Sequence, residues 1–257
     1  METQSSSPMI KAVMHKIFNS LGLEIRLLKN LREAQKREKK MKELENYQFL
    51  ANFDIKSIID VGANEGQFAR TIRHVFPGAT IYSFEPLPDV YKELYSLCAE
   101  DTNIKTFNLA LGNEVGTKQM FSSSFSPSSS MLNMSKLHKE EWPESSVNTS
   151  VMVQQTCLDQ WVKENNQTIG DNILIKLDVQ GYELSVIKGG EKTFKSAKLV
   201  IIEVSFYEFY EKQPLFDDIY KYLCNLGFVY RGNLEQFRSR SGNKILFADA
   251  IFENLGI

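Results

Sequence analysis

A glycine-rich stretch with two carboxylates follows an apolar run early in the chain. It reads Asp60-Val61-Gly62-Ala63-Asn64-Glu65-Gly66. The two glycines allow a tight turn and let a ligand approach the backbone closely. Their spacing differs from the G-x-G-x-x-G dinucleotide motif, and the acidic residues disfavour a phosphate here. The turn suits a ligand that carries an ammonium or a sulfonium, and S-adenosylmethionine (SAM) carries both.

Another acidic residue, Glu85, ends the next apolar run, 19 residues after Gly66. At the end of a parallel strand, such a side chain can accept hydrogen bonds from both hydroxyls of a ribose. The glycine turn and Glu85 together predict a nucleoside-binding site. The alternative is a plain turn beside a solvated carboxylate.

Three further residues are candidates for acid–base chemistry. Asp178 and Glu203 end two later apolar runs, and His138 lies in a serine-rich stretch. Each could act as a general base toward a hydroxyl group. Other roles stay open: Asp178 could cap the turn at Gln180-Gly181, His138 could be a solvated loop residue, and Asp178 with Glu203 could hold Mg²⁺.

Short apolar runs separated by helical patterns must position these residues. We expect strands over residues 57–61, 80–85, 104–110, 172–178 and 198–204. Runs that are apolar throughout indicate strands covered on both faces, as in a parallel sheet. Residues 228–230 and 245–252 predict an antiparallel hairpin. The expected fold class is α/β, a doubly wound Rossmann-like sheet with a C-terminal antiparallel hairpin.

A long stretch without a clear periodic pattern separates the third and fourth expected strands. Residues 122–130 in this stretch are mostly serine. An irregular insertion in a compact domain is often functional. We predict that Ser122 to Trp142 forms a mobile lid that orders over the acceptor substrate.

The first 50 residues differ in composition from the remainder. They carry ten Lys or Arg and six Asp or Glu, whereas the whole chain has a formal charge of -2. Apolar spacing from Ile10 to Leu21 and mixed charges from Arg32 to Glu45 predict a helical N-terminal extension over residues 1–50, before a main domain over 51–257. The apolar stripe could pack on the main domain, pack on a second copy in a homodimer, or contact an anionic membrane surface.

The composition excludes several classes of protein. With 42% apolar and 24% charged residues, the chain is expected to be globular. We find no apolar run long enough for a transmembrane helix and no secretory signal. Three scattered cysteines without a CxxC pair predict reduced thiols, a cytoplasmic location and no metal site. The nearly balanced charge gives no reason to expect a nucleic-acid partner.

Five segments together resemble the FkbM family of SAM-dependent methyltransferases. They are residues 60–68, 84–86, 108–113, 156–161 and 175–184, and the resemblance covers roughly residues 56–230. It implies a class I methyltransferase fold that binds SAM at the carboxyl ends of the first strands. The cofactor-binding residues that it implies are Asp60, Gly62, Ala63, Asn64, Gly66, Phe68, Glu85, Pro86, Asn108, Ala110, Leu111 and Asp178.

The resemblance also implies the reaction, which is O-methylation of a hydroxyl on a sugar, a glycan precursor or another small metabolite. Asp178, Glu203 and His138 are then the candidate catalytic residues. Two alternatives are a non-catalytic SAM-fold module that serves as a scaffold, and a nicotinamide-dependent oxidoreductase. The presence of Asp60, Glu85 and Asp178 disfavours the first, and the glycine spacing disfavours the second.

Overall fold

The computed structural model of the chain describes residues 12–13, 16–17, 28–124, 126–145, 148–165, 169–170 and 172–256. The chain divides into two compact units, residues 1–45 and 46–257. Helix α2 (Leu28–Gln48) contains the mixed-charge run, as predicted, and a short 3₁₀ helix, η1 (Phe49–Asn52), follows it. The helix predicted from Ile10 to Leu21 lies largely outside the described residues. Within the described part of the chain, no helix is long and apolar enough to cross a membrane.

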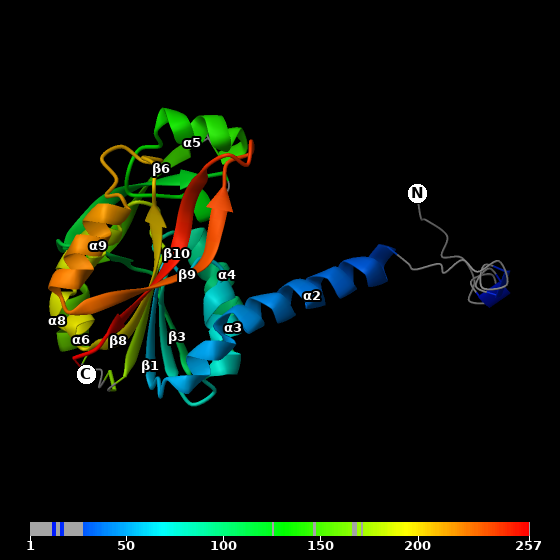
Figure 1. Cartoon of the computed structure of the whole chain (residues 1–257), viewed down its shortest axis with the longest axis horizontal. Coiled ribbons are helices and arrows are strands. Elements are labelled where there is room, and N and C mark those ends of the chain that lie inside the picture. Colours follow the sequence, from blue (N-terminus) through cyan, green and yellow to red (C-terminus); the bar gives the residue numbers. More distant parts are fainter. Residues whose placement is uncertain are drawn as a thin grey trace. The chain divides into compact units, whose positions relative to one another are not determined.

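A seven-stranded sheet of order β3-β2-β1-β7-β8-β10-β9 forms the centre of the second unit (Figure 1). Strands β3, β2, β1, β7 and β8 run parallel to one another, whereas β10 is antiparallel to both β8 and β9. This confirms the predicted doubly wound sheet with a terminal hairpin. The strands are β1 (Ser57–Val61), β2 (Thr80–Phe84), β3 (Ile104–Phe107), β7 (Ile173–Leu177), β8 (Ala197–Ser205), β9 (Phe228–Arg238) and β10 (Ile245–Asn254).

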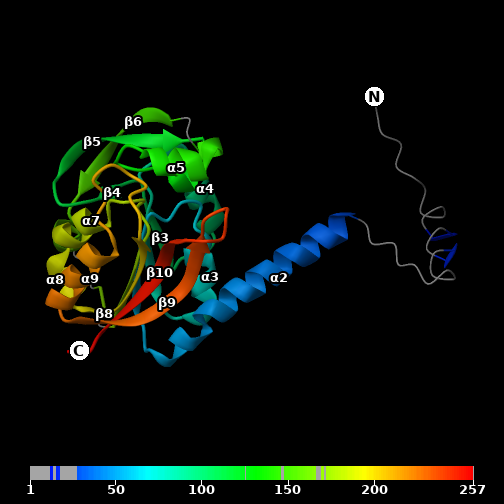
Figure 2. The same ribbon diagram turned by 45° about the horizontal axis from the view of Figure 1, so that its top comes forward.

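Helices cover both faces of this sheet, which explains why strands such as β7 are buried along their whole length. One face carries α6 (Leu158–Glu164), α7 (Glu183–Gly189), α8 (Glu191–Lys195) and α9 (Phe216–Asn225), and the other carries α3 (Gln67–Val75) and α4 (Pro88–Cys98) (Figure 2). Trp161 of α6 is central to the first layer. Its ring meets those of Phe84 and Phe107, with centroids 4.9 Å away in each case.

The stretch between β3 and β7 is a second sheet, so the expectation of an irregular insertion was wrong. Its strand order is β4-β6-β5, and Ala110, predicted in the third strand of the main sheet, begins β4 instead. Four serines of the serine-rich run are buried (Ser123, Ser128, Ser129 and Ser130), and Ser129 Oγ accepts a hydrogen bond from Ser123 N at 3.0 Å. The elements are β4 (Ala110–Leu111), β5 (Gly116–Ser123), η2 (Ser126–Ser128), α5 (Lys136–Glu141), η3 (Pro143–Ser145) and β6 (Asn148–Thr156).

This insertion lies over the carboxyl ends of the parallel strands (Figures 1 and 2). Its serines contact three of the loops that leave those ends. Ser126 Oγ accepts from Asn64 Nδ2 at 3.2 Å, after β1. Ser130 Oγ donates to Gln180 O at 2.6 Å, after β7, and Ser135 Oγ donates to Glu208 O at 2.7 Å, after β8. The insertion therefore covers the carboxyl ends of the parallel strands. That it acts as a mobile lid stays a prediction.

The β1 turn requires glycine at position 62. Gly62 has a φ of +80°, and a Cβ added there would lie 1.9 Å from the carbonyl oxygen of Asp178. We expect Gly62→Ala to lower the free energy of unfolding by at least ~2 kcal/mol, because it combines a backbone clash with a strained conformation. Gly78→Ala is the matched control, since a Cβ there would meet no atom within 4 Å. Urea unfolding curves of equal midpoint for the two variants would contradict this account.

Candidate active site

A buried lysine, Lys176, lies at the centre of the strand ends. It is the register partner of Asp60 in the neighbouring strand β1, and its Nζ lies 2.9 Å from Asp178 Oδ2. Burial alone would lower the pKa of Lys176, but the carboxylates of Asp178, Asp249 and Asp60 raise it above its ordinary value. Lys176 is therefore a stable cation, which is ion-paired with Asp178 and stabilised electrostatically by Asp249 and Asp60.

Asp60, at the end of β1, is fully buried and incompletely bonded. Its Oδ2 accepts a hydrogen bond from Ser83 Oγ at 3.2 Å, whereas its Oδ1 has no partner among the described residues. Burial raises the pKa of Asp60 to about 6, although Lys176 opposes the shift. A buried carboxylate oxygen without a donor is costly, so this position suits a ligand that brings a positive charge or a donor.

The turn after β1 is held by the neighbouring strand β2. Gly62 N and Ala63 N both donate to Phe84 O, and Gly66 begins α3 with a φ of +80°. Asn64 also has a positive φ, of 48°. Phe68, in the first turn of α3, makes an edge contact with the ring of Tyr47, with centroids 5.5 Å apart.

Glu85 joins the turns after β1 and β2. It is 5% exposed, and its carboxylate accepts hydrogen bonds from Asn64 N at 3.0 Å and Leu87 N at 2.9 Å. Burial raises its pKa to about 7. The Asn108 side chain donates to the carbonyls of Glu85 and Pro86, at 2.9 Å each. Each carboxylate oxygen keeps a second lone pair, which a ribose hydroxyl could use.

Gln180 connects the two candidate carboxylates, Asp178 after β7 and Glu203 within β8. Its Nε2 donates to Asp178 Oδ1 at 2.8 Å and to Glu203 Oε1 at 3.1 Å. Its Oε1 accepts from the Tyr210 hydroxyl at 2.8 Å, which fixes the orientation of the amide. Burial raises the pKa of Glu203 well above its ordinary value, and the carboxylates of Asp178 and Asp249 raise it further.

Glu183, not Asp178, caps the turn that follows β7. Its Oε1 accepts hydrogen bonds from Val179 N and Gly181 N, at 3.1 Å each. Asp178 instead bonds the side chains of Lys176 and Gln180. The alternative structural role that the sequence left open for Asp178 is thus filled by another residue.

His138 lies in helix α5, within a small aromatic core. It is 3% exposed, and its Nε2 lies 2.9 Å from Ser145 Oγ. The rings around it are those of Trp142, Phe209 and Tyr210. Burial lowers its pKa to about 4. The interpretation of His138 as a loop residue was wrong, and its packing does not bring it to Asp178 or Glu203.

The chemistry of the site does not fit a divalent cation between Asp178 and Glu203. The group that bridges these two carboxylates is the Gln180 amide nitrogen, a hydrogen-bond donor, whereas Mg²⁺ needs oxygen ligands that point at it. Among the described residues, no group of three or more His, Cys, Asp or Glu side chains could hold a metal.

The structure therefore brings together the turn after β1, Glu85, Asn108 and the Asp178–Glu203 pair, and leaves His138 apart. The side chains of Ala110 and Leu111 are buried, and their strand pairs with β6. The sequence analysis missed Lys176, Gln180 and Asp249. A lysine inside the apolar run of residues 173–177 was a usable signal, because lysine is almost never fully buried unless it is paired.

Comparison with known proteins gives one family and one curated relative. The model of the "Methyltransferase FkbM domain" matches residues 60–230. The "2-O-methyltransferase NoeI" of Sinorhizobium fredii (strain NBRC 101917 / NGR234) is 28% identical over 162 residues, which cover 61% of this chain. The match spans 66% of that relative, just under two thirds of its length.

Solved structures resemble the chain at low sequence identity. Magnesium protoporphyrin IX methyltransferase (ChlM) from Synechocystis PCC 6803 aligns with a TM-score of 0.47 and 12% identity, over 98% of this chain and 100% of that one. A putative RNA methyltransferase from Pyrococcus horikoshii aligns with a TM-score of 0.43 and 12% identity, over 84% of each chain. The fold class rests on the strand order of the chain's own sheet, not on these scores.

The ionised carboxylate of Asp60 should lower the free energy of unfolding of the ligand-free protein. Its folded pKa lies above its ordinary value of 3.8, so the folded state loses stability as the pH rises from about 4 through about 6. We expect Asp60→Asn, which cannot ionise, to raise the free energy of unfolding at pH 7.5 by about 1–3 kcal/mol and to leave it nearly unchanged at pH 4.

Asp54→Asn is the matched control, because the Asp54 side chain is 72% exposed. Chemical denaturation at several pH values measures both variants. A loss of stability in Asp60→Asn at pH 7.5, or a pH profile that matches Asp54→Asn, would refute the interpretation of Asp60.

Proposed function

This chain belongs to the FkbM methyltransferase family, and we propose that it transfers the methyl group of SAM to a hydroxyl oxygen of a sugar, a glycan precursor or another small metabolite. The observation that carries the proposal is the family match, which begins at Asp60 and spans the turn after β1, Glu85, Asp178 and Glu203. The curated relative is itself named a 2-O-methyltransferase, which supports oxygen as the acceptor atom. The match argues against a nicotinamide-dependent oxidoreductase and against a non-catalytic scaffold.

We propose that SAM binds over the ends of β1, β2 and β3. The unpartnered Asp60 Oδ1 and the raised pKa of Asp60 support a cationic ligand there, because a positive charge would stabilise the ionised carboxylate. Glu85 is proposed to accept from the ribose. The remaining proposed contacts are those implied by the sequence: Gly62, Ala63, Asn64, Gly66, Phe68, Pro86, Asn108, Ala110, Leu111 and Asp178.

When bound, SAM supplies an electrophilic methyl group on a sulfonium sulfur. The acceptor oxygen forms the new bond to carbon, the sulfur keeps the electrons of the broken bond, and the hydroxyl proton must pass to a base. We propose Glu203 as this base, because burial raises its pKa, whereas Asp178 is held in an ion pair with Lys176. Gln180 holds the two carboxylates in place through its amide.

The remaining proposals concern the active domain, the size of the substrate, the cellular compartment and the contacts of the N-terminal extension. We propose that residues 51–257 carry the activity and that the substrate is a small molecule. The three cysteines are free, which supports a reducing compartment such as the cytoplasm. For the N-terminal extension, a contact with a second copy of the chain and a contact with a membrane surface both remain proposals.

A screen with methyl-labelled SAM tests the proposed function. The acceptors are sugar nucleotides, lipid-linked sugars and polyketides, and the label should appear on an oxygen of at least one of them. Calorimetric titration should show binding of SAM and not of NAD. Failure to bind SAM, or label transferred only to nitrogen or carbon, would contradict the proposal.

Substitution of the two carboxylates should separate their roles. We expect Glu203→Gln to lower kcat about 100-fold or more with little change in the Kd for SAM, because glutamine keeps the shape and loses the basicity. Asp178→Asn should lower kcat by a smaller factor. The wild-type kcat should rise with pH through the raised pKa of Glu203, since the base must be deprotonated.

Glu93→Gln, an exposed carboxylate of α4, is the control and should behave as wild type. A larger loss in Asp178→Asn than in Glu203→Gln would assign the base to Asp178. Near-normal kcat in both variants would rule out a carboxylate base.

A further inference from the structure

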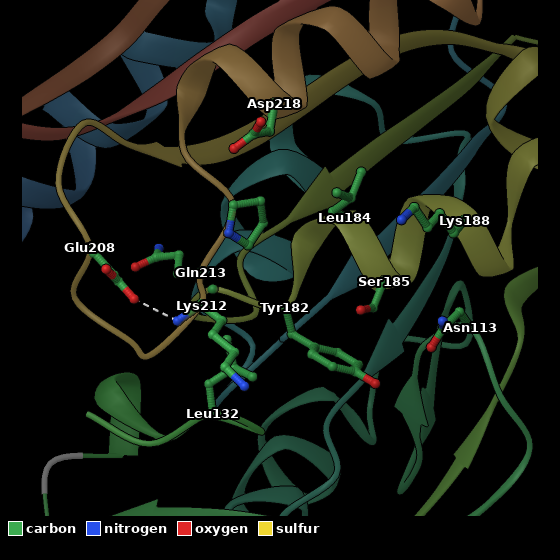
Figure 3. Close-up of a pocket in the computed structure, with 12 residues that line it drawn as sticks. Asn113, Leu132, Tyr182, Leu184, Ser185, Lys188, Glu208, Lys212, Gln213 and Asp218 are labelled. Carbon is green, nitrogen blue, oxygen red and sulfur yellow. Dashed lines mark hydrogen bonds between the residues drawn. The ribbon is translucent and has the colours of Figure 1, made fainter. Parts of the chain in front are cut away.

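A cavity lies beside the candidate active site, between the loops that leave β7 and β8 (Figure 3). Its volume is about 440 Å³, which is within the usual range for a small-molecule site. The loop after β7 and helix α7 form one wall, and residues 208–218 form the other. Leu132 and Asn113 come from the insertion that covers the strand ends.

Five polar side chains of this cavity have free hydrogen-bonding groups. No other described residue forms a hydrogen bond or an ion pair with the side chains of Asn113, Tyr182, Ser185, Lys188 and Lys212. The Nζ of Lys188 lies 5.9 Å from the centroid of the Tyr222 ring. In Figure 3, the Tyr182 side chain extends between Lys212 on one side and Ser185 and Asn113 on the other. Asn113, Lys188 and Lys212 are exposed to solvent, whereas Tyr182 and Ser185 are half-buried. The unused hydroxyls of these last two residues, directed at a cavity, indicate a polar ligand.

The charges of the lining favour a neutral ligand. Two lysines are balanced by two carboxylates, Glu208 and Asp218. Each carboxylate also accepts a backbone N–H, from Lys212 at 2.6 Å and from Leu215 at 3.1 Å, so both are fixed in the wall. The two carboxylates would repel an anionic ligand, and the two lysines would repel a cationic one. Hydroxyl groups both donate and accept, so a polyhydroxylated ligand can use lysine, carboxylate and amide alike.

Tyr182 gives the cavity an apolar surface as well. It is partly buried and packs against the main core, so its ring is held in place. A rigid aromatic ring with a polar tip matches a sugar ring, which has apolar C–H faces and hydroxyls at its rim.

The cavity is also adjacent to the proposed base. Gly181, which lines it, follows Gln180, whose amide contacts Asp178 and Glu203. The wall is closely packed at this point, because a Cβ on Gly181 would lie 3.2 Å from Tyr210 Cδ2 and 3.3 Å from Leu132 Cδ1. We propose that this cavity binds a neutral, polyhydroxylated sugar unit of the acceptor, with Tyr182 beneath its ring; this inference rests on the proposed methyltransferase function.

Saturation-transfer NMR on the full chain with bound S-adenosylhomocysteine tests the inference. The probes are methyl glycosides of neutral hexoses and deoxyhexoses, with glucose 1-phosphate as the anionic comparison. Wild type should transfer saturation to the ring protons of at least one glycoside. Tyr182→Ala, and independently Ser185→Leu, which fills the cavity, should weaken that signal at least fivefold. Tyr95→Ala, a tyrosine 59% exposed on α4, is the matched control and should leave it unchanged.

Three results would overturn the inference: no signal from any glycoside with wild type, an equal signal in Tyr182→Ala, or glucose 1-phosphate binding at least tenfold more tightly through Lys212. Calorimetry with SAM on the same samples distinguishes a failure of the cavity proposal from a failure of the proposed methyltransferase function. Normal SAM binding and methyl transfer, with a sugar signal indifferent to Tyr182, would reject the cavity alone. If the wild-type protein does not bind SAM, the proposed function is rejected.

Discussion

The interaction on which the site depends is the buried ion cluster around Lys176. A buried ammonium is tolerated only with partners, and here they are the carboxylates of Asp60 in β1, Asp249 in β10 and Asp178 just after β7. The cluster cannot form in the isolated segments, because it needs β7 placed between β1 and β8, with β10 next to β8. The strand order of the sheet therefore creates the electrostatics of the site as well as its shape.

The insertion over the strand ends is hydrogen-bonded to the loops that surround this cluster. Ser126, Ser130 and Ser135 bond the loops after β1, β7 and β8, and the Tyr210 hydroxyl fixes the amide of Gln180 between two carboxylates. Gln180 itself has a φ of +53°, a conformation that a non-glycine residue adopts only where its surroundings hold it. The sequence that reads as a flexible loop thus forms the framework that orients the proposed base.

Local patterns explain what could be predicted from the sequence. The apolar runs of β1, β2, β7 and β8 and the glycine turn at residues 60–66 depend on neighbours in the chain, so their positions were predicted well. The second sheet was missed because β4 pairs with β6, some 45 residues away (Ala110 with Gln155), and because buried serines look like exposed ones in a sequence. Gln180 and Glu183 were missed as functional neighbours for the same reason: their partners are defined only by the folded loops.

In the proposed function, SAM lies over the ends of β1, β2 and β3, with its sulfur facing the Asp178–Glu203 pair. A crystal structure of the chain with S-adenosylhomocysteine tests it most directly. We expect the ribose hydroxyls within hydrogen-bond distance of the Glu85 carboxylate, the amino-acid portion over the Gly62–Gly66 turn near Asp60, and the sulfur directed toward Asp178. A ligand bound elsewhere, or one that leaves the Asp60 and Glu85 carboxylates without a contact, would contradict the account.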